Sequence, residues 1–115
     1  MANLLYSTAT IAKSGSLSGA VDMGNFRYFS IQMPAAWTAA GLTFQGSLDG
    51  TTYQNIYDDS GSEVYIPTVS ASTNVSCDSI ALKLIPYRYI KIRSGTAASA
   101  VNQEAARTIY LLGKD

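Results

Sequence analysis

The sequence predicts an all-β fold: an antiparallel two-sheet sandwich that is jelly-roll-like and has about eight strands. The strongest observation is the segment 42–57, where two alternating runs flank Asp49-Gly50, a pair that accepts the positive φ of hairpin turns. Short alternating runs recur along the chain, separated by turns rich in Gly, Ser, Asp and Pro. No segment has a pattern long enough to predict a durable helix. The spacing of the expected strands does not exclude immunoglobulin-like packing, although a single cysteine cannot supply that family's Cys-Trp-Cys pattern.

Chain length and net charge limit the number of domains and the kinds of partner that can be expected. Its 115 residues predict one domain, residues 1–115, large enough to bury a core without disulfides or metal. Lys+Arg and Asp+Glu both number 8, so net charge does not favour nucleic acid or an anionic membrane as a partner. Charged residues make up 14%, below the roughly 25% of typical soluble domains. We therefore expect a neutral, hydroxyl-rich surface that tolerates close contact with other proteins.

The expected strands follow one another with short connections. Residues 4–13 alternate and carry hydroxyl groups on both faces, which predicts an edge strand. Residues 107–113 are largely apolar on both faces, which predicts a strand that pairs inside a sheet. The other expected strands, in chain order, are 26–33, 42–48, 51–57, 63–66, 74–77, 80–85 and 87–95.

Alternation also assigns side chains to faces. In residues 26–33, the core face of a central strand is expected to hold Phe29, Ile31 and Met33. The first run of the 42–57 hairpin has one apolar face and one face turned to water. The apolar face is expected to hold Leu42, Phe44, Gly46 and Leu48, and the wet face Thr43, Gln45 and Ser47.

Trp37 lies in the segment 34–41, where the distance between Pro34 and Gly41 allows one or two helical turns at most. A loop is therefore expected. The indole has two interpretations: a plug that covers one end of the core, or a contact residue for a partner or a sugar. Trp side chains are usually highly buried but seldom fully so, which is compatible with either role.

The segment 87–95 carries the most distinctive expected surface. Arg88, Ile90 and Ile92 fall on one side, and the other side is an outer row of Tyr87, Tyr89, Lys91 and Arg93. Interleaved aromatic and basic side chains can stack on bases or sugars and pair with phosphates or carboxylates. Alternatively, the cations pair with Asp or Glu across the sheet. Because the net charge is zero, a solvated face or a protein interface is favoured over nucleic acid.

The residues provide no recognisable catalytic set, so no enzymatic activity and no cofactor or metal are expected. The chain has no His, and its lone Cys77 therefore lacks the usual general base and is expected to be a small core residue. The acidic turn Asp58 to Ser62 offers oxygen atoms, but its spacing differs from that of the twelve-residue calcium loop. Turn formation is the expected role of these acids.

Two segments resemble motifs of discoidin-type jelly rolls. FQGSLDGTTYQNI resembles a strand that ends in Gly-Ser-x-Asp-Gly-Thr before an aromatic residue, and YRYIKIRSG resembles a late strand with Arg-Tyr-Ile-x-Ile. The matching residues are Gly46, Ser47, Asp49, Gly50, Thr51 and Tyr53, then Arg88, Tyr89, Ile90 and Ile92. The resemblance covers about a quarter of the chain. The chain lacks the terminal cysteine pair and much of the length of those modules.

The same fragments are similar to small β-sandwich proteins of tailed bacteriophages. This resemblance implies a structural virion protein, a capsid decoration or cement subunit that bridges capsomers, with the major capsid protein or another virion protein as partner. It also implies a homo-oligomer, a dimer or trimer. The resemblance also implies location on the virion. The N-terminus has no basic region, apolar core or cleavage site of a signal peptide, so synthesis in the host cytoplasm is expected.

The alternative is a carbohydrate- or receptor-binding module of a phage tail or fibre, with a glycan as partner. Such a module needs an exposed aromatic side chain in a concave cluster of loops, for which Trp37, Tyr53 and Tyr57 are the candidates. Together with the outer row of 87–95, the candidate contact residues are Trp37, Tyr53, Tyr57, Tyr87, Tyr89, Lys91 and Arg93.

Overall fold

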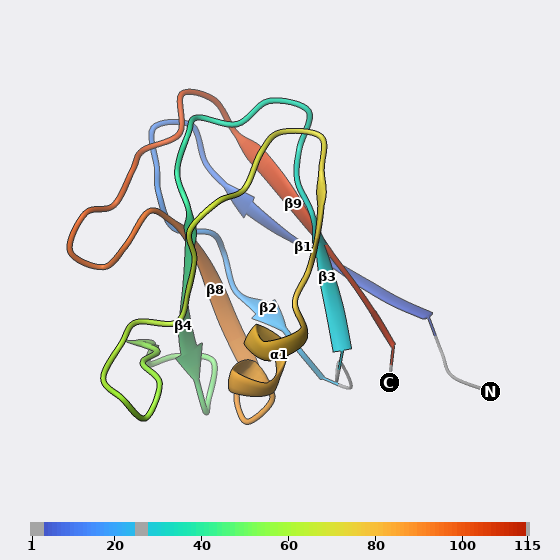
Figure 1. Cartoon of the computed structure of the whole chain (residues 1–115), viewed down its shortest axis with the longest axis vertical. Helices are drawn as coiled ribbons and strands as arrows, with labels where there is room; N and C mark the ends of the chain where they lie inside the picture. The colour runs from blue at the N-terminus through green and yellow to red at the C-terminus, as the bar shows by residue number, and fades with distance from the viewer. Residues whose placement is uncertain (1–3, 25–27, 115) are drawn as a thin grey trace.

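The computed structural model describes residues 4–24 and 28–114, which form two packed β-sheets with a short helix at one end (Figure 1). All strand pairs in this part of the chain are antiparallel. The elements are β1 (Leu4–Ile11), β2 (Val21–Asp22), β3 (Tyr28–Gln32), β4 (Leu42–Ser47), β5 (Gln54–Asn55), β6 (Tyr65–Ile66), β7 (Asn74–Ser76), α1 (Asp78–Leu84), β8 (Tyr89–Ser94) and β9 (Arg107–Lys114).

The strand order is that of a jelly roll. One sheet has the order β1-β9-β3-β7, and the other has the order β2-β8-β4-β5, with β6 also paired to β4. Apart from β4 to β6, which stay in one sheet, successive strands alternate between the two sheets. The predicted antiparallel two-sheet sandwich is confirmed, and this order excludes the immunoglobulin-like alternative, in which hairpin neighbours share a sheet.

The first and last strands occupy the positions that the sequence predicts. β1 is the edge of its sheet, and β9 lies between β1 and β3, with Ala9 opposite Ile109 and Ile31 opposite Leu111. Ile109 and Leu111 are fully buried, whereas Tyr110 and Leu112 on the other face are each 39% exposed. β9 therefore supplies the core on one side and an outer sheet surface on the other.

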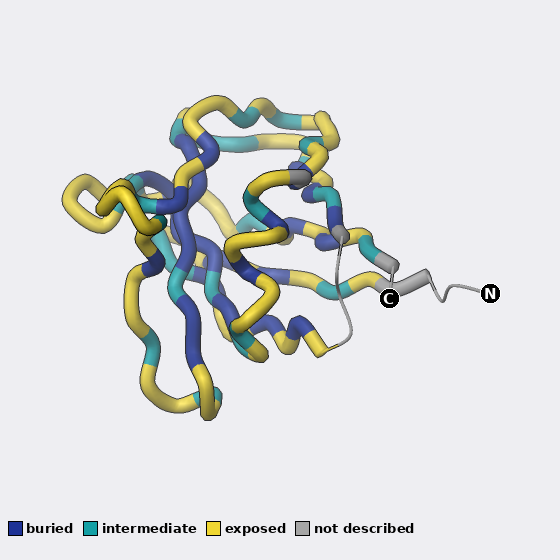
Figure 2. The backbone as a smooth tube through the Cα atoms, turned by 60° about the horizontal axis from the view of Figure 1, so that its bottom comes forward, coloured by how far each residue is buried: buried dark blue, intermediate teal, exposed yellow. Residues whose placement is uncertain are grey.

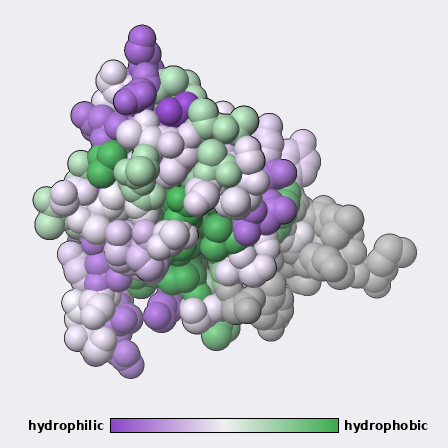
Figure 3. Space-filling model, turned by 45° about the horizontal axis from the view of Figure 1, so that its top comes forward, coloured by the Kyte–Doolittle hydropathy of each residue, from purple (hydrophilic) through white to green (hydrophobic). Residues whose placement is uncertain are grey.

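The core lies between the two sheets, and buried segments run through the middle of the molecule while the loops are mostly exposed (Figure 2). Phe29, Ile31 and Met33 are buried, as alternation predicts, and Cys77 is buried among them. Seen with the top of Figure 1 turned forward, apolar side chains gather in the middle of the view between hydrophilic groups (Figure 3). The segment 34–41 is neither helix nor strand, so the predicted loop is confirmed.

The strand expected at 80–85 is wrong, because Asp78–Leu84 is the helix α1. The buried residues of the helix and its N-cap are Cys77, Ala81 and Leu84, a spacing of four and three that matches a helix and not a strand. Leu82, which alternation would place in a core with Leu84, is exposed. Pro86 follows the C-cap residue Ile85 and cannot continue the helix.

The predicted faces of the 42–48 run are wrong at three positions. Leu48 is 91% exposed, and Thr43 and Ser47 are buried. Leu48 leaves the apolar face because β4 ends at Ser47 and a six-residue loop, 48–53, replaces the two-residue turn. Thr43 is covered because β4 is an inner strand whose outer face carries further side chains, and its hydroxyl donates to the carbonyl of Gly95 at 2.8 Å.

Candidate functional site

The predicted outer row of 87–95 is only partly formed. Tyr89, Lys91 and Arg93 lie in β8 opposite Ser47, Gln45 and Thr43 of β4, so these six residues share the outer face of the five-stranded sheet. Tyr87 precedes β8 and does not belong to this row. We call the face made by Tyr89, Lys91 and Arg93 the β8 row.

Arg93 is engaged inside the molecule. Its guanidinium donates to the carboxylate of Glu63 at 3.2 Å and to the amide oxygen of Asn55 at 2.6 Å. The two side chains of the ion pair are 9% and 14% exposed. The same Glu63 carboxylate accepts the backbone N–H of Ala97, so it also holds the loop after β8. Arg93 therefore pairs with an acidic residue of the same sheet region, which is the alternative to a contact role that the sequence leaves open.

Lys91 and Tyr53 form a second charged contact on this face. The ammonium of Lys91 lies 4.4 Å from the centre of the Tyr53 ring, within the range of a cation–π interaction. The hydroxyl of Tyr53 is buried without a hydrogen-bond partner. Burial raises the pKa of this phenol above its usual value, and the nearby Tyr89 and Asp49 add to the shift. Both side chains are half-buried, so they present a mixed aromatic and cationic surface.

The tip of the β4–β5 hairpin is organised by hydrogen bonds from its own side chains. The Asp49 carboxylate accepts the backbone N–H groups of Thr51 and Thr52 at 2.9 and 3.0 Å, and the Ser47 hydroxyl accepts that of Gly50 at 2.9 Å. The N–H of Thr52, followed by that of Thr51, lowers the pKa of Asp49. Gly50 has φ +80°, and an added Cβ would lie 3.3 Å from the Tyr89 ring. Asp49 therefore acts as a turn former.

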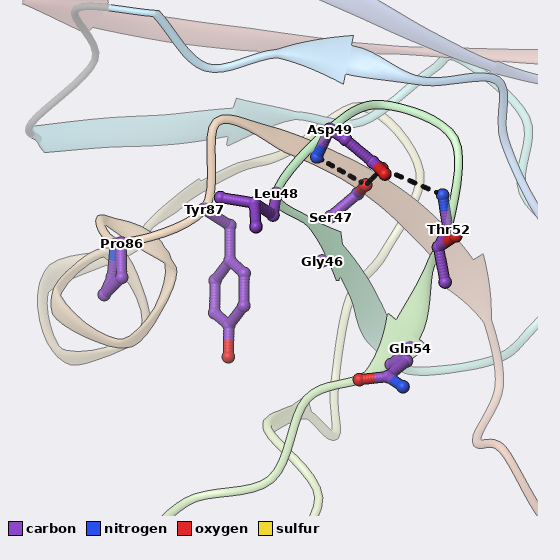
Figure 4. Close-up of a pocket in the computed structure, with 8 residues that line it drawn as sticks. All are labelled: Gly46, Ser47, Leu48, Asp49, Thr52, Gln54, Pro86 and Tyr87. Atoms are coloured by element: carbon purple, nitrogen blue, oxygen red, sulfur yellow. Dashed lines mark hydrogen bonds between the residues drawn. The ribbon is translucent and has the colours of Figure 1, made fainter.

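A hollow of about 380 Å³ lies between this hairpin and the segment that joins α1 to β8. Figure 4 shows the ring of Tyr87 on one side, with Gln54 across from it and the hydrogen-bonded Ser47 and Asp49 at the hairpin. An added Cβ on Gly46 would lie 2.5 Å from the Tyr87 ring, so the ring rests directly on the bare backbone of β4. Gly46 lies two residues after the buried Phe44, so both residues are on the core face of β4. Tyr87, which packs on Gly46, therefore lies on the core side of the sheet.

The remaining predicted contact residues lie elsewhere. Trp37 is half-buried against the core, and its indole N–H donates to the carbonyl of Ala40 at 3.1 Å. Its loop precedes β4 and the hollow follows β4, so the two lie at opposite ends of that strand (Figure 1). Tyr57 is exposed beside the acidic turn Asp58 to Ser62, and its backbone forms an isolated β-bridge with Glu63. The structure therefore brings together Tyr53, Tyr89 and Lys91, and it separates Trp37 from them.

Sequence reasoning missed the residues that line the hollow with Tyr87, namely Leu48, Thr52, Gln54 and Pro86. The discoidin-type resemblance was the signal that pointed there, because its two segments are neighbours in the fold, with Gly46 opposite Ile90 and Ser47 opposite Tyr89. Residues 4–24 and 28–114 hold no group of three His, Cys, Asp or Glu side chains suited to a metal ion. Over the same ranges no helix is long and apolar enough to cross a membrane.

Comparison with known proteins gives one informative result. No protein-family model matches the chain, and no curated protein matches its sequence. Among solved structures, the SPBc2 prophage-derived protein YomS matches with a TM-score of 0.57 and 10% identity, over 100% of this chain and 96% of that one. The two chains share their fold. At this identity the likeness establishes the architecture.

Proposed function

We propose that this chain is a structural protein of a bacteriophage virion, a decoration subunit that binds the assembled shell. The observation that carries the proposal is the full-length likeness to a prophage-derived chain, since the sandwich accounts for 96% of that phage-encoded protein. The phage-type resemblance of the sequence points to the same role.

The surface supports a role in packing against other proteins. Charged residues make up only 14% of the chain, and several large apolar side chains are exposed, among them Leu48, Leu82 and Tyr6. In the proposed role, these side chains lose water when the subunit seats where shell proteins meet. The added interface stabilises the assembled shell over its dissociated subunits by mass action.

A second candidate function is the binding of a carbohydrate or another receptor by a phage tail or fibre. The hollow favours it, because an aromatic ring, Tyr87, lies in a concave site together with the polar side chains of Thr52 and Gln54. Leu48 at the rim adds apolar surface for the face of a sugar ring.

Co-sedimentation separates the two functions. The purified chain is mixed with assembled phage heads and, separately, with isolated tails, and binding is measured alongside a broad glycan array. The decoration role predicts saturable binding to heads at a fixed number of copies per shell, and absence of head binding overturns it. The receptor role predicts an array signal that Leu48→Ser weakens. Leu82→Ser, which removes an exposed leucine of α1 that does not line the hollow, is the matched control.

A further inference from the structure

Among the described strands, β1 has the longest free edge. β1 has eight residues, whereas the other strands with a free edge, β2, β5, β6 and β7, have two, two, two and three. All eight residues of β1 pair with β9 on one side. On the other side, the described contacts are confined to its end, where the N–H of Gly19 donates to the carbonyl of Thr10 and Ile11 bridges to Ser18. The backbone from Leu4 to Ala9 is thus open to a further strand.

This edge lacks the features that normally prevent strand addition. Proteins protect long edges with Lys, Pro, bulges or very short strands. The sequence of β1, LLYSTATI, contains no charged residue and no proline, and its register with β9 is continuous without a bulge. Lys13 is the first charge, and it lies beyond the end of the strand. Such an edge is unprotected unless another chain covers it.

The direction of the backbone groups follows from one hydrogen bond. Along an antiparallel strand, successive residues direct their N–H and C=O groups alternately to one neighbour and to the other. The Thr10 carbonyl accepts from Gly19, on the side away from β9. Tyr6 and Thr8 therefore also direct both groups to the open edge, while Ser7 and Ala9 direct theirs to β9.

We propose that β1 pairs antiparallel with β1 of a second copy of this chain, about a two-fold axis that passes between the two Ser7 residues. In this register Tyr6 of one copy lies opposite Thr8 of the other, and each such pair exchanges two backbone hydrogen bonds. An axis at Thr8 would place Tyr6 opposite Thr10, whose carbonyl is already occupied by Gly19, whereas the axis at Ser7 brings only Leu4, the first residue of β1, opposite Thr10. An axis at Tyr6 would overlap only residues 4–8 of the two strands, and the axis at Ser7 overlaps residues 4–10. An axis between two residues would place outward side chains opposite inward ones, which the sheet excludes.

A second copy fits this edge because β1 itself carries no charge and the sheet beside it is almost uncharged. Pairing joins the two four-stranded sheets into one of eight strands. The outward register positions with uncharged residues are Tyr6, Thr8, Thr10, Ser30, Gln32, Asn74, Ser76, Thr108, Tyr110 and Leu112. Among the described strands of this sheet, the charged residue in the same register is Lys114, at the last position of β9 and one strand in from the edge. No like charges meet across the two-fold axis. The proposal stands independently of the virion role, because it concerns only the chain and its copy.

Analytical ultracentrifugation of the full chain tests the pairing. We expect a concentration-dependent species of twice the 12.3 kDa of one chain. Thr8→Pro removes an N–H that points to the open edge and leaves the ladder to β9 intact, so it should weaken dimerisation by about tenfold or more while the β-sheet circular dichroism is retained. Thr108→Lys is the control: it places a charge on the same outer face but in the inner strand β9, and the dimer should persist.

Disulfide trapping tests the register even if the proline variant fails to fold. Directly opposite residues that are not hydrogen-bonded to each other lie about 4.5 Å apart at Cα, within the range of a disulfide. Ser7→Cys should therefore form a covalent dimer on mild oxidation. Thr8→Cys should not, because the two Thr8 residues are diagonal in the proposed register. The native Cys77 is buried in the core and serves as the background in both variants.

Each outcome has a defined meaning. A wild-type chain that stays monomeric at high micromolar concentration overturns the proposal. A dimer that resists Thr8→Pro, or that is lost in Thr108→Lys, shows that the copies meet elsewhere. Cross-linking through Thr8→Cys in place of Ser7→Cys contradicts the register. A monomer whose binding to phage heads is abolished by Thr8→Pro assigns the edge to a shell protein and rejects the second copy as its occupant.

Discussion

Arg93 and Glu63 form an ion pair of 3.2 Å on the outer face of the five-stranded sheet, although that face is formally turned to solvent. Both side chains are nearly buried there, and Asn55 of β5 and Thr43 of β4 accept further hydrogen bonds from the same guanidinium. Through the N–H of Ala97, the pair also fixes the start of the loop between β8 and β9. Arg93, which the sequence predicts as a contact residue for a partner, is therefore buried within the chain.

Glu63→Ala should destabilise the fold, because it leaves the Arg93 charge almost buried without its partner. We expect a loss of about 2 to 4 kcal/mol, below the usual figure for breaking a fully buried pair since both groups retain some exposure. Replacing both residues, Arg93→Met with Glu63→Leu, should cost clearly less than Glu63→Ala alone. Urea unfolding measures all three proteins. Equal losses in the single and the double variant would show that the charge of Arg93 is not the cause.

Gly46→Ala should lower stability because the new methyl group would lie 2.5 Å from the Tyr87 ring. The ring must move out of the hollow, at a cost of about 1 to 3 kcal/mol. Gly19→Ala is the matched control, since an added Cβ there meets nothing within 4 Å. Thermal unfolding should show a clear decrease for the first variant and little change for the second. In the receptor role proposed as the second candidate function, Gly46→Ala should also weaken glycan binding, because Tyr87 is displaced.

Leu111→Ala and Leu112→Ala test the orientation of β9. Leu111 is fully buried between the sheets, so its truncation should cost about 2 to 5 kcal/mol. Leu112 points outward on the same strand, and its truncation should change the free energy of unfolding by about 0.5 kcal/mol or less. Chemical denaturation compares them directly. A larger loss for Leu112→Ala would contradict the register of β9 with β1 and β3.

Acidification should weaken the hairpin tip. Hydrogen bonds from Thr52 and Thr51 hold the pKa of Asp49 below its ordinary value of 3.8. The carboxylate therefore stabilises the folded state above that value, and its contribution is lost as the pH falls through the lower pKa of the folded chain. In Asp49→Asn, which cannot titrate, stability should fall less steeply between about pH 4 and pH 2. Thermal unfolding across this range measures the difference, and identical profiles would contradict it.

Side-chain alternation predicted much of the fold. Phe29, Ile31 and Met33 form the core face of β3, and the apolar character of 107–113 placed β9 inside its sheet. These predictions succeeded because a strand buried on one face requires a period of two. Alternation failed in 78–84, where a short apolar stretch fits a strand and a helix about equally well and only the burial of Cys77, Ala81 and Leu84 distinguishes them.

The candidate site was less predictable. Tyr53, Tyr89 and Lys91 do meet, because the hairpin brings 53 back beside β8. Trp37 and Tyr57 were grouped with them by residue type, and the structure keeps Trp37 at the other end of β4. Residue type shows which side chains could bind a ligand, whereas their proximity depends on loop paths that no local pattern records.

The sequence by itself determined the class of this protein: an antiparallel sandwich whose register follows from strands with one buried face, since a slip of one residue would expose the core. Tertiary structure alone decided two features. It paired Arg93 with Glu63 in a nearly buried ion pair, and it placed Tyr87 over the bare backbone of Gly46. Each depends on which strands become neighbours across the sandwich, and that pairing joins segments too distant in the chain for any local pattern to specify.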